Sequence, residues 1–148
     1  MKKMNFLACI ENSIGSRMFR TYYDANGKDV LENGNLSCAY YVSSILHLFS
    51  LIDRPHFTVS GTEFAMINAG WYEIKKPRRA CVVLWEPLIQ NGKSHFHIGF
   101  YIGDEQAISN RSSLEAVGEH SLHYSGLDKE NLKRKAKVSK LYWHKDLD

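Results

Sequence analysis

The segment 95–103 constrains the fold more than any other part of the chain. Its sequence, His-Phe-His-Ile-Gly-Phe-Tyr-Ile-Gly, alternates phenylalanine and isoleucine with His95, His97, Gly99 and Tyr101. A period of two is typical of a β-strand, in which neighbouring side chains point to opposite faces. We therefore expect a strand with one face in a core. On the other face, Gly99 has no side chain and lets another element approach closely.

Three earlier segments have helical patterns. Apolar residues recur at helical spacing over 6–18, which predicts an amphipathic helix. Residues 38–52 contain no Gly or Pro and predict a mostly buried helix, with Ser37 at the N-cap. A polar loop rich in Gly and Asn, 24–35, separates these two helices. Residues 60–63 have capping-box form and predict a short third helix that ends at Gly70.

The second half of the chain is rich in β-branched and aromatic residues. Strands are expected at 71–74, 80–85, 96–102 and 107–109, with weaker ones at 115–117 and 140–143. Helices first and strands later predict the α+β class with an antiparallel sheet. A length of 148 residues suits a single domain over 1–148.

Composition limits the classes of partner. The net charge is only +3, and its basic cluster at 129–140 is interpreted as a solvated surface, which makes nucleic acid an unlikely partner. The longest apolar run, 39–52, is interrupted by polar residues and is shorter than the ~20 residues of a membrane span. The N-terminus carries no convincing signal peptide, so we expect a soluble protein, either cytoplasmic or exported by a non-classical route. Oligomeric state stays open.

Cys38 is the candidate nucleophile. The chain has three cysteines and no CxxC spacing, which argues against a disulfide scaffold. Cys38 stands where a helix should begin, and the partial positive charge of a helix N-terminus favours the reactive thiolate. The N–H groups there can also hold an oxyanion. Cys9 and Cys81 fall in apolar patterns and are interpreted as packing residues.

His97 is the candidate base. A helix carrying Cys38 across Gly99 would bring the thiol near His97. A base also needs an orienting partner, which we expect on the strand after the hairpin. An odd-length loop after 102 would place Ser109 on the His97 face, and an even-length loop would place Asn110 there. Asn110 is preferred because its amide oxygen can accept from an imidazole N–H.

These segments resemble the NlpC-type cell-wall peptidases of the papain-like superfamily, which is related to the CHAP amidases. Residues 37–42, Ser-Cys-Ala-Tyr-Tyr-Val, resemble the cysteine segment, and residues 97–103, His-Ile-Gly-Phe-Tyr-Ile-Gly, resemble the histidine strand. Residues 76–85 are similar to the family's lead into a central strand. The order of elements over roughly 4–110 also agrees. The chain departs from the family at Ser37, Ala39 and Tyr40, where Asp, Ser and Gly are usual.

The resemblance implies a papain-like fold in which a cysteine-bearing helix packs on an antiparallel sheet. It also implies a cysteine-dependent amide hydrolase that acts on peptidoglycan stem peptides or related amides and needs no cofactor or metal. Cys38 would be the nucleophile, His97 the general base and acid, and Asn110 or Ser109 the orienting residue. Either Tyr22 or Tyr23 could assist, as an upstream tyrosine does in the family.

Two other functions remain open from sequence. The fold could serve as a non-catalytic binding module in which Cys38 is inert. Less strongly, His95, His97, His120 and His123 could bind zinc in a metal-dependent amidase, although the chain has no HExxH motif.

Overall fold

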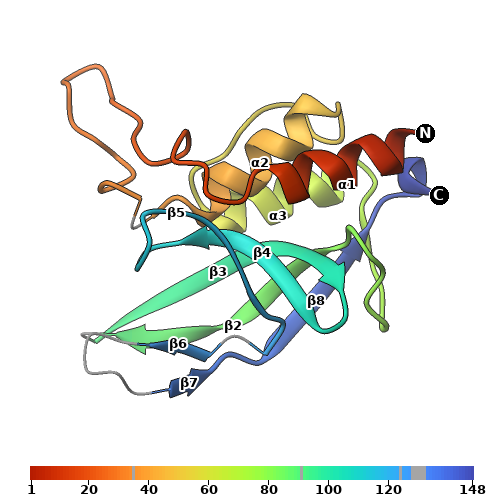
Figure 1. Cartoon of the computed structure of the whole chain (residues 1–148). Helices are drawn as coiled ribbons and strands as arrows, with labels where there is room; N and C mark the ends of the chain where they lie inside the picture. The colour runs from red at the N-terminus through yellow and green to blue at the C-terminus, as the bar shows by residue number, and fades with distance from the viewer. Residues whose placement is uncertain (35, 91, 124, 128–132) are drawn as a thin grey trace.

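Three helices lie along one face of a sheet in the computed structural model (Figure 1). The structure describes residues 1–34, 36–90, 92–123, 125–127 and 133–148. Within these residues the α-helices are α1 (Lys2–Asn12), α2 (Cys38–Leu48) and α3 (Val59–Asn68), and a short 3-10 helix, η1 (Lys145–Leu147), ends the chain. The three expected helices are therefore present; α1 and α3 begin and end earlier than expected, and α2 ends earlier.

The sheet is antiparallel and its strands follow the order β1-β8-β2-β3-β4-β5. The bounds are β1 (Tyr72–Glu73), β2 (Val82–Gln90), β3 (Lys93–Gly103), β4 (Gln106–Arg111), β5 (Ala116–Ser121) and β8 (Val138–Trp143). The strands β6 (Ser125–Leu127) and β7 (Lys133–Lys135) form a separate pair. Helices followed by an antiparallel sheet confirm the α+β class.

The ends of the helices have local causes. The first helix stops at Asn12 rather than continuing to residue 18, because Gly15 adopts a left-handed φ of +84° and its N–H donates to Val117 O at 2.8 Å. The N-cap of α3 is Thr58, whose side chain accepts from Gly61 N, so the capping-box prediction at residue 60 was two residues late. At the start of α2, Ser37 does occupy the N-cap position, but it makes no side-chain capping bond.

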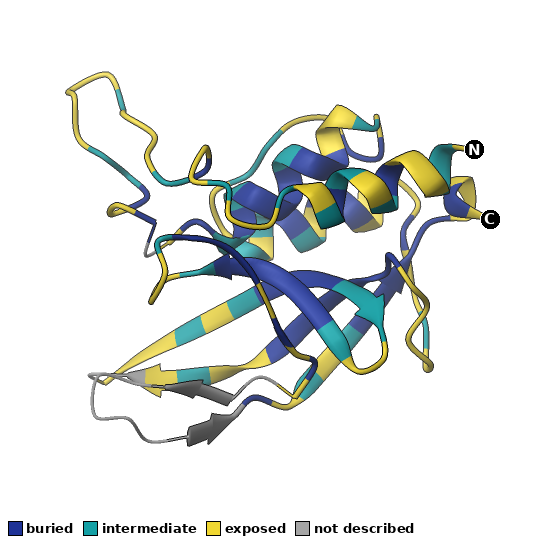
Figure 2. Cartoon of the chain, viewed as in Figure 1, coloured by how far each residue is buried: buried dark blue, intermediate teal, exposed yellow. Residues whose placement is uncertain are grey.

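The core lies between the helices and the sheet (Figure 2). Phe100 of β3 is fully buried at its centre, with ring centroids 5.6 Å from Phe6 of α1 and 5.8 Å from Tyr41 of α2. Edge-to-face pairs of this kind add to the stabilisation from burial alone. Because Ile98 also points to this side, α1 and α2 cover the apolar face of β3.

Part of the basic cluster predicted at 129–140 lies outside the described residues. Residues 129–132 lie outside the described residues, and so do the side chains of 133–135. Among the described residues, no helix is long and apolar enough to cross a membrane.

Gly99 allows β3 and β4 to approach closely, which gives a test of the packing. A Cβ at Gly99 would lie 2.6 Å from Ile108 O, 2.9 Å from Ser109 Cβ and 3.1 Å from the Trp85 ring. Gly99→Ala should therefore lower the free energy of unfolding by about 1–3 kcal/mol in urea denaturation, the usual cost of overpacking.

Gly118→Ala is the matched control, because Gly118 also lies in a strand but would meet the flexible side chains of Arg111 and Leu114. A smaller loss for Gly118→Ala is expected. Equal losses for the two variants would contradict a specific close approach at Gly99.

Candidate active site

Cys38 is the first residue of α2 and lies beside β3. Its sulfur donates a long hydrogen bond to Phe96 O at 3.9 Å. The backbone N–H of Ile98 also reaches the sulfur, as do those of Cys38 and Ala39 at the helix start. Phe96 O and Ile98 N belong to the peptide groups on either side of His97, so the sulfur lies at the level of His97 along the strand.

The edge of β3 is open to α2 at this level. Among the described residues, β3 pairs with β2 as far as Lys93, whereas its pairing with β4 ends at Phe100 and Ile108. The backbone groups of residues 96 and 98 therefore contact the start of α2 rather than continue a ladder with β4. Because the pairing of β3 with β4 ends at Phe100, the backbone of β3 before that residue can hold the thiol of Cys38.

His97 is held on the opposite face of β3 from the core. Its Nε2 forms a 2.8 Å hydrogen bond with Ser109 Oγ of β4, and Ser109 Oγ forms a second bond of 2.7 Å with His120 Nε2 of β5. His120 Nδ1 in turn bonds Ser121 O at 2.8 Å. The ring of Trp85 packs against both imidazoles, with centroids 5.2 Å from His97 and 5.4 Å from His120.

Ser109, rather than the preferred Asn110, is the partner of His97. A two-residue turn at Asp104 and Glu105, both with positive φ, pairs Gly103 with Gln106. That even loop alone would place Asn110 on the His97 face. An irregularity between Tyr101 and Gly103 shifts the register by one residue and pairs Tyr101 with Ala107. The shift reverses the face of every later side chain in β4, and Ser109 turns toward His97.

Asn110 lies on the helix-covered face instead, and the assignment of Asn110 as the orienting residue is corrected. Its side-chain amide donates to Gly34 O at 3.0 Å, in the loop before α2. The same loop is fixed near β5 by Arg20, which forms a 3.0 Å ion pair with Glu115. Asn110 thus helps to place the start of α2, and through it Cys38.

The close approach at Gly99 also differs from the expectation. The Cys38 helix does not cross Gly99, because α2 packs on the face of Ile98 and Phe100. The groups above Gly99 are Ser109 and Trp85 of the neighbouring strands. Gly99 therefore makes room for the partner of His97 rather than for the nucleophile.

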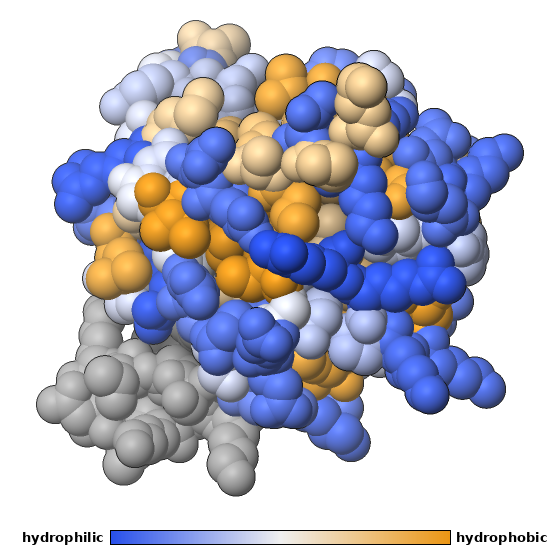
Figure 3. Space-filling model, turned by 45° about the vertical axis from the view of Figure 1, so that its right-hand side comes forward, coloured by the Kyte–Doolittle hydropathy of each residue, from blue (hydrophilic) through white to orange (hydrophobic). Residues whose placement is uncertain are grey.

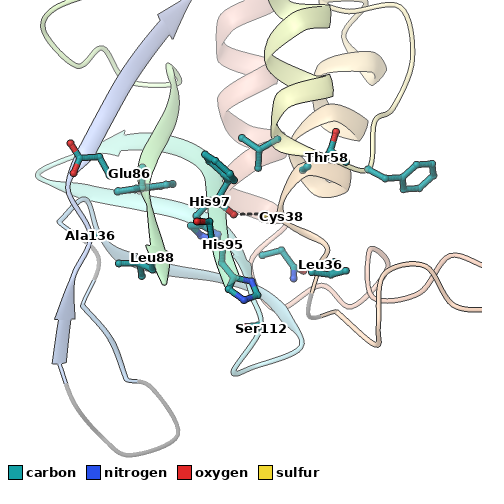
Figure 4. A pocket seen from close by; sticks show the side chains of 16 residues that line it. Leu36, Cys38, Thr58, Glu86, Leu88, His95, His97, Ser112 and Ala136 are labelled. Carbon is teal, nitrogen blue, oxygen red and sulfur yellow. Dashed lines mark hydrogen bonds between the residues drawn. The ribbon is translucent and has the colours of Figure 1, made fainter. Parts of the chain in front are cut away.

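Cys38 and His97 line the same cavity, which has a volume of about 300 Å³ (Figure 4). Its walls come from the start of α2, the start of α3 and the strands β2 and β3, and Asn110 and Ser112 close one side. Leu36, Phe57 and Phe96 are exposed apolar residues of this lining. Other exposed apolar side chains are seen between hydrophilic ones on the surface (Figure 3).

Burial keeps both candidate groups neutral at rest. It raises the pKa of the Cys38 thiol, and the N–H groups of Ile98, Ala39 and Cys38 offset only part of the rise. Burial also lowers the pKa of His97 to about 3, with smaller effects from His120 and Arg111. The N–H groups of the helix N-terminus lower the thiol pKa as expected, but desolvation outweighs them and the net shift is upward.

The remaining candidates take different places. Tyr22 packs against Tyr40 and Phe57, the latter in the cavity lining, whereas Tyr23 is exposed and bridges to Asp29. Cys81 is buried and Cys9 packs on the core. Within the described part of the chain, no group of three His, Cys, Asp or Glu residues could hold a metal ion.

His120 and Trp85 are the members of this arrangement that sequence reasoning missed. His120 was considered only as a zinc ligand, and Trp85 only as a strand residue. The contact of His120 with Ser109 depends on the pairing of Ser109 with Gly118 and of Ala107 with His120, which the sequence does not specify.

Comparisons with known proteins do not place the chain in a family. No protein-family model matches it, and no curated protein matches it in a sequence search.

The lowered pKa values of His97 and His120 predict acid sensitivity. Their values of about 3 and about 4 lie below the ordinary value of 6.5. Between pH 6.5 and pH 4 the unfolded chain binds these protons and the native protein does not. The free energy of unfolding should therefore fall as the pH falls, by up to about 1.4 kcal/mol per pH unit for each histidine.

Urea denaturation of wild type, His97→Gln and His123→Gln at a series of pH values checks this. The His97→Gln variant should lose part of the slope. The His123→Gln variant changes an exposed histidine and should keep it. A slope in His97→Gln as steep as in wild type would contradict the assignment.

Proposed function

We propose that this protein is a cysteine-dependent amide hydrolase with a papain-like fold, similar to the NlpC-type peptidases. The observation that carries the proposal is the lining of one cavity by Cys38, at a helix N-terminus, and by His97, which Ser109 holds from a neighbouring strand. A nucleophile, a base and a residue that orients the base are the parts that thiol hydrolysis requires.

Cys38 attacks the carbonyl carbon of the scissile amide as its S–H proton passes to His97. The bond that forms is S–C, and the carbonyl becomes an oxyanion. The N–H groups at the start of α2, which already face the sulfur, are available to hold that oxyanion. His97 then gives its proton to the leaving amine, and water releases the acyl group from Cys38.

The neutral resting state determines how the nucleophile is activated. Because the pKa of the thiol is raised and the pKa of His97 is about 3, His97 removes the thiol proton during attack rather than before it. As the S–C bond forms, the negative charge passes to the carbonyl oxygen, so the step creates an oxyanion and the imidazolium of His97 together. The proposed substrates are peptidoglycan stem peptides or related amides, as the resemblance implies.

The same ionisation state favours one alternative, a papain-like binding module with an inert thiol. Burial that raises the pKa of Cys38 lowers its thiolate fraction at neutral pH. Turnover and thiol chemistry separate the two functions.

Turnover tests the nucleophile most simply. Cys38→Ala should lower the release of amine from peptidoglycan fragments by roughly 10³-fold or more, because no other group supplies the nucleophile. Cys9→Ala is the matched control, since Cys9 is a half-buried thiol of α1 that packs on the core. Wild-type turnover by Cys38→Ala would exclude Cys38 as the nucleophile. No turnover by the wild type on these fragments or on other peptide amides would favour the binding module.

Alkylation tests the mode of activation. In a Cys9→Ala background, iodoacetamide should label Cys38 about tenfold faster for each pH unit between 6 and 8, following the thiolate fraction. A rate that is constant between pH 5 and pH 7 would instead show a preformed thiolate–imidazolium pair. Protection in the native protein even at pH 9, relative to the unfolded protein, would support the inert alternative.

A further inference from the structure

His120 ends a chain of hydrogen bonds that starts at His97. Ser121 O can only accept, so the 2.8 Å bond from His120 Nδ1 requires a proton on that nitrogen. A neutral imidazole carries one proton, and the Nε2 of His120 is then an acceptor. The pKa of His120, which burial lowers to about 4, keeps the ring neutral at pH 7.

The acceptor state of His120 Nε2 fixes the direction of the other two hydrogen bonds, from Ser109 to His120 and from His97 to Ser109. Because His120 Nε2 accepts, the single hydroxyl proton of Ser109 points to it across 2.7 Å. Ser109 Oγ must then accept in its 2.8 Å bond with His97, so His97 Nε2 carries the proton. In neutral His97 the lone pair is left on Nδ1, which is the form of the ring that can take a proton.

Packing holds Ser109 and the two imidazole rings in a single orientation. Ser109 is fully buried, and His120 is 9% exposed. The Trp85 ring packs on both imidazoles, and its own N–H is bonded to Leu122 O at 2.6 Å. A 180° flip of either ring would put a carbon in place of its Nε2 and break the bond of that nitrogen to Ser109 Oγ.

We infer that His120 and Ser109 are positioning residues that fix the tautomer of His97 with Nδ1 unprotonated, ready to accept the thiol proton of Cys38. This inference rests on the proposed function for its catalytic meaning, but the tautomer itself does not depend on activity. In the step it serves, the S–H bond of Cys38 breaks and an Nδ1–H bond forms, and Ser109 continues to accept from Nε2 of the resulting imidazolium.

Nitrogen NMR of the full chain tests the tautomer directly. Two-bond ¹H–¹⁵N correlation spectra at pH 7 should show His97 protonated at Nε2 and His120 protonated at Nδ1, with assignments from His97→Gln and His120→Gln. His97 protonated at Nδ1 in the wild-type protein would overturn the inference. Loss of turnover in Cys38→Ala concerns the proposed function and leaves the tautomer result unaffected.

Variants test the role of His120. His120→Phe removes the acceptor for Ser109 and should give His97 a mixture of tautomers, with kcat reduced roughly 10- to 100-fold and KM little changed. His120→Gln keeps an acceptor for Ser109 and should restore part of the Nε2-protonated form of His97 and part of kcat. His123→Phe, the same change at an exposed histidine three residues on, should leave both as in wild type. Unchanged tautomer and kcat in a folded His120→Phe would overturn the inference.

Discussion

The packing of α2 on Phe100 is the interaction on which the rest of the structure depends. Tyr41 lies one turn into α2, and its contact with Phe100 sets the position of the helix along β3. That position places Cys38 beside the peptide groups that flank His97. Loss of this aromatic contact would affect the core and the candidate active site together, because the same strand serves both.

Strand β3 separates packing from chemistry by its alternation. One face gives Ile98 and Phe100 to the core, and the other gives His97 to an arrangement of buried polar groups. Buried polar groups lower the stability of a fold unless they are hydrogen-bonded. Here Ser109 Oγ bonds both His97 and His120, so each of the three side chains has a partner. The result is a neutral and oriented imidazole, at the cost of stability in acid.

Much of the fold followed from local pattern, and the partner of His97 did not. The alternation around His97 and the apolar run after Cys38 are signals within single elements, so the strand and the helix could be predicted. Whether Ser109 or Asn110 faces His97 depends on one irregularity near Tyr101, which no residue pattern marks. His120 depends further on the pairing of β4 with β5, and the raised pKa of Cys38 on burial that only the assembled fold creates.

The central claim is that Cys38 attacks a carbonyl carbon with His97 as its base. Intact-mass and peptide-mapping mass spectrometry after mixing with an activated N-acetyl-peptide ester measures this most directly. We expect an acyl group on Cys38 that forms and decays in the wild type and forms far more slowly in His97→Gln. Turnover of the ester without an adduct on Cys38, or equal acylation of Cys9, would contradict it.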